Sequence, residues 1–343
     1  MGEEQAAPKP AEAAAAALEL TGFVMSAEDA ERRAAAAGVA TVQDLLPLLI
    51  PSARKRAQVP ISDFQVGAVG LGASGRVYVG VNLEFRGVPL CHSVHAEQFL
   101  VANAAAAGES ALRAVAVSHM PCGHCRQFLQ EIRGAAGIQI LVTSDAEQGR
   151  APEWRTVASL LLRPFGPHDL LEKNVPLVLE AHDNALGDPV VAAAANGFGP
   201  GDLDARLREA AEAAARAAHV PYSQCPSGFA VADGDGRIYA GGCLESAAYN
   251  PTLGPVQAAI IAMVAAGGGP AGDVVAAALV EKEQAAVAQE ATARIFLDAV
   301  APHASFHVYK DTRDQWWDWG IKLRDVNLDI NLAADSSSSG WTW

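Results

Sequence analysis

The chain has 343 residues, half of them hydrophobic, and a formal net charge of -14. This length suits two domains better than one, and the acidic balance argues against a nucleic-acid partner, whose phosphates would require Lys and Arg. No run of about eighteen large apolar residues is free of a charge or a breaker, so the composition predicts a soluble chain that acts on a small, weakly charged substrate.

The N-terminal part of the chain divides into a low-complexity segment and a helical one. Residues 1–24 are rich in Ala, Glu and Pro and are predicted to be disordered. They begin with acidic residues, unlike a secretory signal or an Arg-rich transit peptide, so we expect the chain in the cytosol. Residues 25–59 contain two helical patterns, and Ser26 followed by Asp29 predicts an N-cap. We expect these helices to pack onto the domain that follows.

A β-hairpin is predicted next, in ISDFQVGAVGLGASGRVYVGVNLEF, where two Val-rich segments flank a Gly and Ser stretch. Gly70, Gly72 and Gly75 spell the G-x-G-x-x-G of dinucleotide-binding proteins. That fingerprint requires a helix to begin at its end, so that a pyrophosphate meets the helix N-terminus. The strand-like residues RVYVGVN follow instead, and we therefore assign these glycines to a turn.

Candidate metal ligands follow in HAEQ and PCGHC. His95 begins the helical pattern HAEQFLVANAAAAG, and Cys122 and Cys125 share one face in the first turn of a second helix. The positive end of a helix dipole favours thiolate at such positions. One imidazole and two thiolates supply three zinc ligands and leave the fourth tetrahedral position for water. Glu97, two residues from His95, would then carry a proton.

The number and spacing of the cysteines indicate that they are free thiols or metal ligands and do not form disulfides. Five cysteines are too few and too widely spaced in 343 residues for a disulfide framework, and their number is odd. Only the pair in PCGHC has ligand spacing. The other three are expected to be buried as small apolar side chains: Cys91, Cys225 and Cys243.

A second copy of the hairpin occurs later in the chain, after a Pro- and Gly-rich stretch that predicts a linker at 181–200. VPYSQCPSGFAVADGDGRIYAGGCLES matches the first hairpin at one constant offset, for example Pro60 with Pro221 and Glu84 with Glu245. A constant offset across a whole hairpin indicates duplication of a supersecondary unit. Two copies of one fold are therefore predicted.

The duplication predicts a first domain at 60–180 and a second at 201–310. A Trp-rich tail at 311–343 follows and has no assigned role. Clustered Trp residues would suit an interaction segment, whereas LAADSSSSG would suit a poorly ordered extension.

The two copies differ in their chemistry. At the same offset, Val256 and Ala258 replace His95 and Glu97, and no cysteine follows Cys243. H-x-E followed by P-C-x-x-C is the signature of zinc deaminases, so we expect catalysis in the first copy alone. The alternative is a closed structural zinc, whose fourth ligand would be one of three histidines: His92, His119 or His124.

These motifs closely resemble the two-domain, homodimeric cytidine deaminases of bacteria and plants. The resemblance covers about Leu45 to Tyr309 and rests on SDFQVGAV, GVNLEF, HAEQ, PCGHCRQFL, FGPHDL and YNPTLGPVQAA. It implies a duplicated α/β fold in which each copy is a three-layer α/β/α unit with a mixed sheet and the second copy is degenerate. It also implies a cytosolic homodimer that acts on a nucleoside in pyrimidine salvage, with no nucleic-acid or membrane partner.

The resemblance assigns roles to residues of the first copy. It makes His95, Cys122 and Cys125 the ligands of one zinc ion (Zn2+) per chain, and Glu97 the proton shuttle. Five residues are implied as substrate contacts: Phe64, Asn82, Glu84, Ala96 and Phe165.

Four of the implied contacts have specific partners. Asn82 and Glu84 would hydrogen-bond the ribose hydroxyls, and Phe64 would pack on the pyrimidine, its alternative role being core packing. Phe165 would reach a neighbouring subunit's pocket. Glu245 retains the position of Glu84 in the degenerate copy, which indicates that this carboxylate also has a structural role.

The implied reaction is hydrolytic deamination of cytidine, and of 2'-deoxycytidine, to the uridine product and ammonia. Water adds to C4 of cytosine, and Glu97 moves its proton to N3 and then to the leaving amino group. A polynucleotide deaminase is an alternative that the acidic charge opposes. A deoxycytidylate deaminase would need a basic phosphate pocket, for which Arg86 is a candidate. A zinc-binding pseudoenzyme whose paired domains serve assembly is the third alternative.

Overall fold

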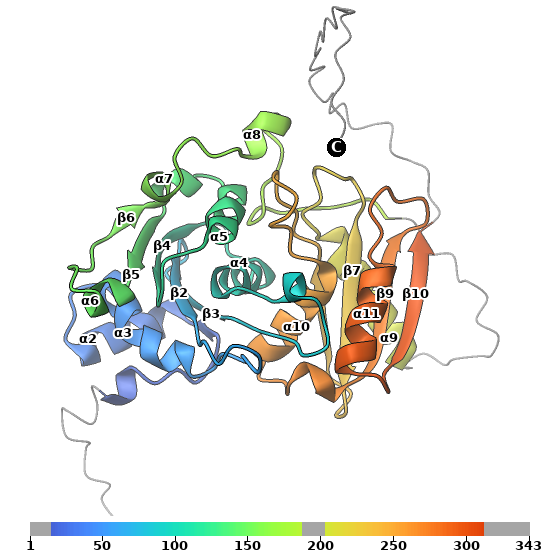
Figure 1. Cartoon of the computed structure of the whole chain (residues 1–343), viewed down its shortest axis with the longest axis horizontal. Coiled ribbons are helices and arrows are strands. Elements are labelled where there is room, and N and C mark those ends of the chain that lie inside the picture. Colours follow the sequence, from blue (N-terminus) through green and yellow to red (C-terminus); the bar gives the residue numbers. More distant parts are fainter. Residues whose placement is uncertain (1–14, 187–202, 312–343) are drawn as a thin grey trace, which may run out of the picture.

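Two β-sheets frame the structure, a computed structural model that describes residues 15–186 and 203–311 (Figure 1). The first sheet has the strand order β1-β3-β2-β4-β5-β6 and the second has the order β10-β9-β7-β8. The strands are β1 (Val24–Met25), β2 (Gly67–Gly72), β3 (Val77–Val81), β4 (Leu112–Val117), β5 (Gln139–Val142), β6 (Arg155–Thr156), β7 (Ser227–Asp233), β8 (Ile238–Gly242), β9 (Val274–Lys282) and β10 (Ser305–Asp311).

Helices cover both faces of each sheet. The longer helices are α2 (Ala27–Ala37), α3 (Val42–Arg54), α4 (Ala96–Ala106), α9 (Leu203–Arg216), α10 (Pro255–Ala265) and α11 (Glu290–Val300). The short ones are η1 (Leu90–His92), α5 (Gly123–Phe128), η2 (Leu129–Glu131), η3 (Ala135–Gly137), α6 (Ser144–Glu147), α7 (Val157–Leu160), α8 (Pro167–Leu170) and η4 (Ala271–Asp273). As predicted, α2 and α3 pack onto the first domain, α3 against the sheet and α2 against α3, and Ser26 caps α2 by accepting from the N–H of Asp29.

The two sheets repeat one topology. In the first copy β2 pairs antiparallel with β3 and β4, and β4 pairs parallel with β5. In the second copy β7 pairs antiparallel with β8 and β9, and β9 pairs parallel with β10. The predicted hairpins and the duplicated mixed α/β sheet are confirmed.

Equivalent glycines set the distance between sheet and helix in both copies. A Cβ at Gly80 would lie 2.1 Å from the carbonyl oxygen of Ala96, in the first turn of α4. A Cβ at Gly241 would lie 2.4 Å from the carbonyl carbon of Ala258 in α10. Only glycine permits so close an approach of strand and helix. In the first copy this packing fixes the start of α4, where the HAE motif lies.

The two copies share a core. Figure 1 shows α4 and α10 next to each other between the sheets, and the two helices are in contact. One cluster of buried apolar side chains contains Phe99 and Leu100 from α4 together with Ile260 and Ile261 from α10. Burial of apolar area at this boundary therefore stabilises both copies together.

The prediction that residues 1–24 are disordered is wrong for the described part, which begins at residue 15. Val24 and Met25 form β1, which pairs with β3, and the ring of Phe23 stacks on Phe99 with 5.1 Å between centroids. Leu20 is also buried. The few large side chains of this segment reach the core and cover the edge of β3, so its alanine-rich composition was a poor guide.

The linker is shorter than predicted. Residues 181–186 pack on the second copy, where Asn184 donates to main-chain carbonyls of Ala215 and Ala218 and Leu186 is buried. The rest of the predicted linker lies outside the described residues, as does the predicted tail beyond Asp311, which itself ends β10.

Within the part of the chain that the structure describes, no single helix has the length and hydropathy needed to cross a membrane. The pair α2 and α3, bent by 85°, meets the criteria of length and composition when the two are taken together. Leu45, Leu46 and Leu49 of α3 are fully buried against the first sheet, as in a core helix.

Candidate active site

The first candidate ligand lies at the start of α4. His95 is the N-cap residue of this helix, with extended backbone angles. Its main-chain N–H donates to the side-chain oxygen of Gln98 at 3.3 Å, so Gln98 closes the first turn. This arrangement directs the His95 ring toward α5, where its Nδ1 meets two sulfur atoms.

The second pair of ligands lies at the start of α5. Cys122 is the N-cap residue, and Cys125 lies in the first turn, with Pro121 just before the helix. The Nδ1 atom of His95 is 3.4 Å from Cys122 Sγ and 3.2 Å from Cys125 Sγ, and the two sulfurs are 3.6 Å apart. Residues far apart in sequence therefore form one compact triangle of donor atoms.

This triangle fits zinc. Around a tetrahedral zinc, with bonds of about 2.3 Å to sulfur and about 2.0 Å to nitrogen, neighbouring ligand atoms lie about 3.5 to 3.8 Å apart. The three separations are within a few tenths of an ångström of that range. One imidazole and two thiols also form the donor set that suits zinc.

The two sulfurs differ in their proton affinity. The hydrogen bond between the two sulfurs lowers the pKa of Cys122 to about 4. The same hydrogen bond, together with burial, raises the pKa of Cys125. Without a cation the pair therefore shares one proton, and a cation between the sulfurs would take the place of that proton.

Glu97 lies beside this triangle and is buried. Its side chain is 5% exposed, and its Oε2 atom accepts from the Cys125 thiol at 3.3 Å. Burial raises the pKa of Glu97 above the usual value for a carboxyl group. A carboxyl with a raised pKa can both take and return a proton near neutral pH.

His124 is the histidine that remains near the triangle. One potential ligand atom from each of His95, His124 and Cys125 lies within 4.8 Å of the others. The Nε2 atom of His124 is 3.1 Å from the carbonyl oxygen of Asn250, and its Nδ1 is buried without a hydrogen-bond partner. The other two candidates for a closed site have different contacts, Ser118 for His119 and Gln257 for His92.

Glu84 lies under the loop that precedes β2. Its carboxylate accepts from the N–H groups of Ile61 and Ser62, at 3.0 and 2.9 Å, and from the Ser62 hydroxyl at 2.5 Å. Partial burial acts to raise the pKa of Glu84, but these hydrogen bonds outweigh it and lower the pKa. The structural role indicated by Glu245 is therefore present in both copies.

Asn82 directly follows β3, and its side chain holds the loop before β2, which carries Phe64. The Asn82 amide accepts from the N–H of Val66 at 2.8 Å and donates to the carbonyl of Phe64 at 2.9 Å. The Phe64 ring is 52% exposed and lies 4.6 Å from the ring of His119, so the core-packing alternative for Phe64 is wrong. The loop presents this ring on the surface.

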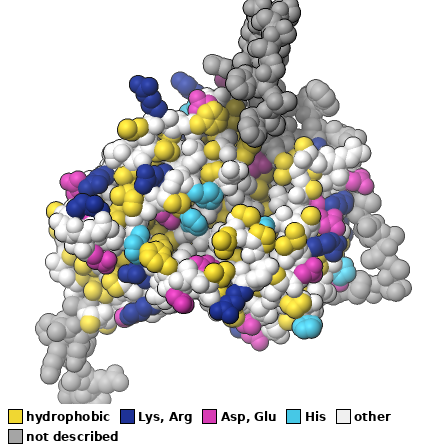
Figure 2. All heavy atoms as spheres, viewed as in Figure 1, with side chains coloured by type: hydrophobic (Ala, Val, Ile, Leu, Met, Phe, Trp, Pro, Cys, Tyr) yellow, Lys and Arg dark blue, Asp and Glu magenta, His cyan; other side chains and the backbone are white. Residues whose placement is uncertain are grey.

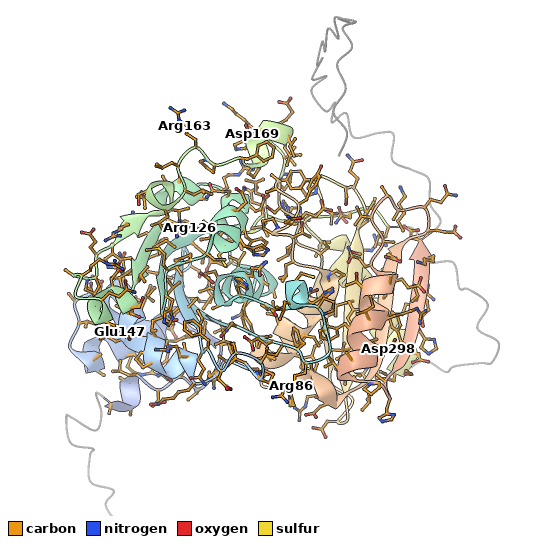
Figure 3. All side chains as sticks on the ribbon, in the orientation of Figure 1. Arg86, Arg126, Glu147, Arg163, Asp169 and Asp298 are labelled. Carbon is orange, nitrogen blue, oxygen red and sulfur yellow. The ribbon has the colours of Figure 1, made fainter. Side chains whose placement is uncertain are left out.

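The remaining predicted contacts lie elsewhere. Ala96 is fully buried in the first turn of α4, so only its main chain could face a substrate. Phe165 is 47% exposed on the loop before α8, and its carbonyl accepts a hydrogen bond from Gln127. Arg86 donates twice to the carbonyl of Pro60 and lies at the lower edge of the molecule in Figure 3.

The cysteine predictions hold for two of the three residues outside the triangle. Cys225 and Cys243 are buried, as expected, whereas Cys91 is exposed. Cys91 lies in the short helix η1, between the exposed Leu90 and the partly buried His92, and the helix buries none of its residues.

Sequence reasoning left three site neighbours without a role. Gln98 donates to the carbonyl of Pro251 at 3.0 Å, Asn250 contacts His124, and Glu131 is fully buried at the boundary of the two copies. The sequence predicts that Glu131 lies on the same helix as the cysteines. Its partners lie in the second copy, and no local sequence pattern predicts these contacts.

Comparisons with known proteins agree with this site. The family described as "Cytidine and deoxycytidylate deaminase zinc-binding region" matches residues 42–141 and again residues 157–294. The chain is 49% identical to cytidine deaminase 1 of Arabidopsis thaliana, over 84% of this chain and 97% of that protein. It is 40% identical to a cytidine deaminase of Sodalis glossinidius, over 76% of this chain and 81% of that protein.

A crystal structure of a cytidine deaminase from Mycobacterium tuberculosis is also similar to part of the chain. It covers 36% of this chain and 97% of its own, with 32% sequence identity and a TM-score of 0.32.

Proposed function

The chain belongs to the cytidine deaminase family of zinc-binding proteins, and from this premise we propose that it hydrolyses cytidine to uridine and ammonia. The observation that carries the proposal is the contact of the buried Glu97 carboxyl with the His95, Cys122 and Cys125 triangle. A proton-transfer group beside three zinc ligands is the arrangement that hydrolytic deamination requires. The second copy, which lacks these residues, is taken as non-catalytic.

The residues of the triangle would hold the zinc, which when bound lowers the pKa of water and so supplies a nucleophile near neutral pH. Glu97 would accept the proton of that water, pass it to N3 of the pyrimidine, and deliver a proton to the leaving amino group. Its burial excludes bulk water as a competing proton source. A carboxyl with a raised pKa suits both transfers.

Three of the substrate contacts meet at the loop before β2, which carries Phe64 and is held by Asn82 and Glu84. Phe64 would pack on the pyrimidine, since its ring is exposed and its main chain is fixed by Asn82. Asn82 and Glu84 would contact the ribose with the lone pairs and protons that remain after their loop contacts. The N–H groups at the start of α4, including that of Ala96, would face the base, and Phe165 would reach the site of a second subunit.

The setting of the enzyme is part of the proposal. We propose a cytosolic homodimer that salvages pyrimidine nucleosides, with 2'-deoxycytidine as a second substrate. Thiolate ligands need a reducing compartment, which supports the cytosol. The exposed apolar side chains of Leu162 and Phe165 support a subunit contact. Light scattering would test the dimer, and a monomer with full activity would contradict it.

Two observations weigh against nucleotide and polynucleotide substrates. On the face of the molecule in Figure 2, Lys and Arg side chains are dispersed and form no continuous tract. The guanidinium of Arg86 is engaged by the carbonyl of Pro60, so it is poorly placed to bind a phosphate. A protein that recognises phosphates gathers cationic groups around them.

The test follows the loss of cytidine absorbance in purified protein, with cytidine 5'-monophosphate as a parallel substrate. Glu97→Gln is the matched variant, since the amide keeps the size of the side chain and cannot carry the proton. We expect turnover of cytidine alone, lowered by at least about 10² to 10⁴ in the variant while zinc content stays the same. Near-normal turnover by Glu97→Gln would refute the role of Glu97, and conversion of the nucleotide alone would refute the substrate.

A further inference from the structure

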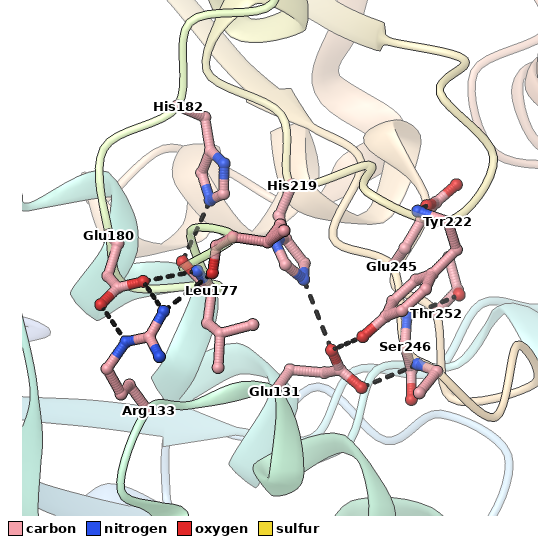
Figure 4. A network of polar contacts seen from close by, with 12 residues as sticks. Glu131, Arg133, Leu177, Glu180, His182, His219, Tyr222, Glu245, Ser246 and Thr252 are labelled. Carbon is pink, nitrogen blue, oxygen red and sulfur yellow. Dashed lines mark hydrogen bonds and ion pairs between the residues drawn. The ribbon is translucent and has the colours of Figure 1, made fainter. Parts of the chain in front are cut away.

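A carboxylate of the first copy is held by three donors of the second copy (Figure 4). Glu131 is 0% exposed, and it accepts from the Tyr222 hydroxyl at 2.6 Å and from the N–H of Ala247 at 2.8 Å. Its third partner is the Nε2 atom of His219, at 3.4 Å. A buried carboxylate is stable only where donors satisfy it, so the second copy determines where Glu131 can lie.

The tyrosine in this network is a dependable donor. Burial and the negative charge of Glu131 raise the pKa of Tyr222, so its hydroxyl keeps its proton at any physiological pH. Tyr222 belongs to the second copy's version of the loop that carries Ser62 in the first copy, and Ser223 ties that loop to Glu245. Contacts within the second copy therefore hold the loop that carries the Tyr222 hydroxyl, independently of Glu131.

Glu131 lies on the same helical segment as the two cysteine ligands. Cys125 is in α5, which runs directly into η2, and Glu131 is the last residue of η2. Six residues of helix span about 9 Å. A shift of Glu131 along the domain boundary is therefore transmitted to Cys125 with little loss, because a helix of this length is stiff.

Two further contacts join the ligand helices to the same part of the second copy. The carbonyl of Asn250 meets His124, the residue between the two cysteines, at 3.1 Å. Gln98 donates to the carbonyl of Pro251, and its oxygen accepts from the main chain of His95. Each of the two helices that carry metal ligands is thus attached to the segment 247–251.

We propose that Glu131 is a positioning residue, through which the non-catalytic copy holds the cysteine-bearing helix in the geometry that binds zinc. The inference rests on the proposed function and gives the second copy a part in it. Loss of the Glu131 carboxylate leaves Tyr222 and Ala247 without their acceptor and releases the C-terminal end of the helical segment. The two sulfurs then hold the metal less firmly, so zinc leaves faster.

The test measures the rate at which the folded holoenzyme loses zinc to an excess of a chromogenic chelator. Glu131→Ala should release zinc about 10-fold faster or more, the range found when partners of metal ligands are removed. Glu131→Gln retains the size and one acceptor oxygen, so its release rate should be nearer to that of the wild-type protein. Tyr222→Phe deletes one donor without altering the packing and should shift the release rate in the same direction as Glu131→Ala.

Glu109 offers a matched control within the first copy. Its carboxylate is 2% exposed and accepts from Ser74, from the Tyr78 hydroxyl at 2.9 Å and from the N–H of Ser110 at 2.9 Å. It closes the far end of the hairpin and contacts neither ligand helix through these bonds. Glu109→Ala should therefore lower the thermal midpoint, as Glu131→Ala does, without a change in the rate of zinc release.

The outcomes separate positioning from stability and from the reaction itself. Equal rates of zinc release for Glu131→Ala and Glu109→Ala would overturn the inference. If Glu131→Ala fails to fold, Tyr222→Phe decides: a wild-type release rate overturns the inference, and a faster one supports it. With cytidine as substrate, a fall in kcat at unchanged KM is expected for the Glu131 variant. Altered zinc release in a protein that never deaminates cytidine would refute the proposed function and still support the role of Glu131.

Discussion

The hydroxyl of Ser62 donates to the carboxylate of Glu84 at 2.5 Å, and the equivalent Ser223 donates to Glu245 in the second copy. In both copies the same carboxylate also accepts from two successive main-chain N–H groups of the loop. The second copy lacks the metal ligands and still keeps this arrangement. The contact therefore holds the loop in shape, and in the first copy that loop carries the exposed ring of Phe64.

The duplicated contact predicts different results for the same substitution. Ser62→Ala should raise KM for cytidine about fivefold, because one hydrogen bond contributes about 1 kcal/mol to the order of the loop. Ser223→Ala should lower the free energy of unfolding by the same amount, about 1 kcal/mol, and so lower the thermal midpoint, while KM stays unchanged. Steady-state rates and thermal unfolding of both variants provide the check. Equal KM values for the two variants would contradict the prediction.

The sequence was sufficient for those features that depend on local pattern or on repetition. Val-rich segments around a Gly and Ser stretch predicted the first hairpin, and the constant offset predicted its second copy and therefore two copies of one fold. The spacing of His95, Cys122 and Cys125 predicted the donor triangle because helix starts place such residues in a defined direction.

Features that depend on contacts between distant segments were not predictable in this way. Phe23 looked like part of a disordered segment, since only its partner Phe99, in α4, shows that it belongs to the core. Glu131 had no role assigned from the sequence, because its donors Tyr222 and Ala247 come from the other copy. Cys91 looked like a small core residue, but the short helix that carries it buries none of its side chains.

Removal of zinc should abolish turnover and expose one thiol. Cys122 is exposed in the structure, so in the metal-free protein an alkylating agent can reach it, whereas in the holoenzyme the metal occupies its sulfur. Cys91 is exposed and outside the donor triangle, so it should be alkylated in both forms and serves as the internal control. Mass spectrometry of peptides before and after chelation gives the comparison. Protection of Cys122 in the metal-free form would contradict the assignment.

The N-terminal segment should contribute to stability through one aromatic side chain. Phe23 is 5% exposed, stacks on Phe99 and accepts a hydrogen bond from Asn103 through its carbonyl. Phe23→Ala should lower the free energy of unfolding by about 3 kcal/mol, because it leaves a cavity against α4. Phe23→Leu, which fills most of that space, is the control and should lose less than half as much. Denaturant unfolding would contradict the prediction if both variants matched the wild-type protein.

Acid should destabilise the folded chain in part through His182, next to the Glu131 network (Figure 4). Burial, with the nearby ring of His219, lowers the pKa of His182 from 6.5 to about 4, while its Nε2–H donates to the carbonyl of Leu177 at 3.1 Å. At a pH between these two pKa values, His182 is protonated in the unfolded chain and neutral in the folded chain. Stability is therefore fully present above about pH 6.5 and is lost as the pH falls toward 4.

The size of this loss can be measured with His182→Gln, whose amide can still donate to Leu177 and does not titrate. At pH 5 the wild-type protein should lose about 1 to 2 kcal/mol more than the variant, relative to pH 8, since the ring is only partly buried. Guanidinium midpoints of both proteins at the two pH values give the difference, in which the titration of shared carboxylates such as Glu84 and Glu109 cancels. If the difference between the midpoints of the two proteins were the same at pH 5 and pH 8, His182 would titrate alike in the folded and unfolded chains.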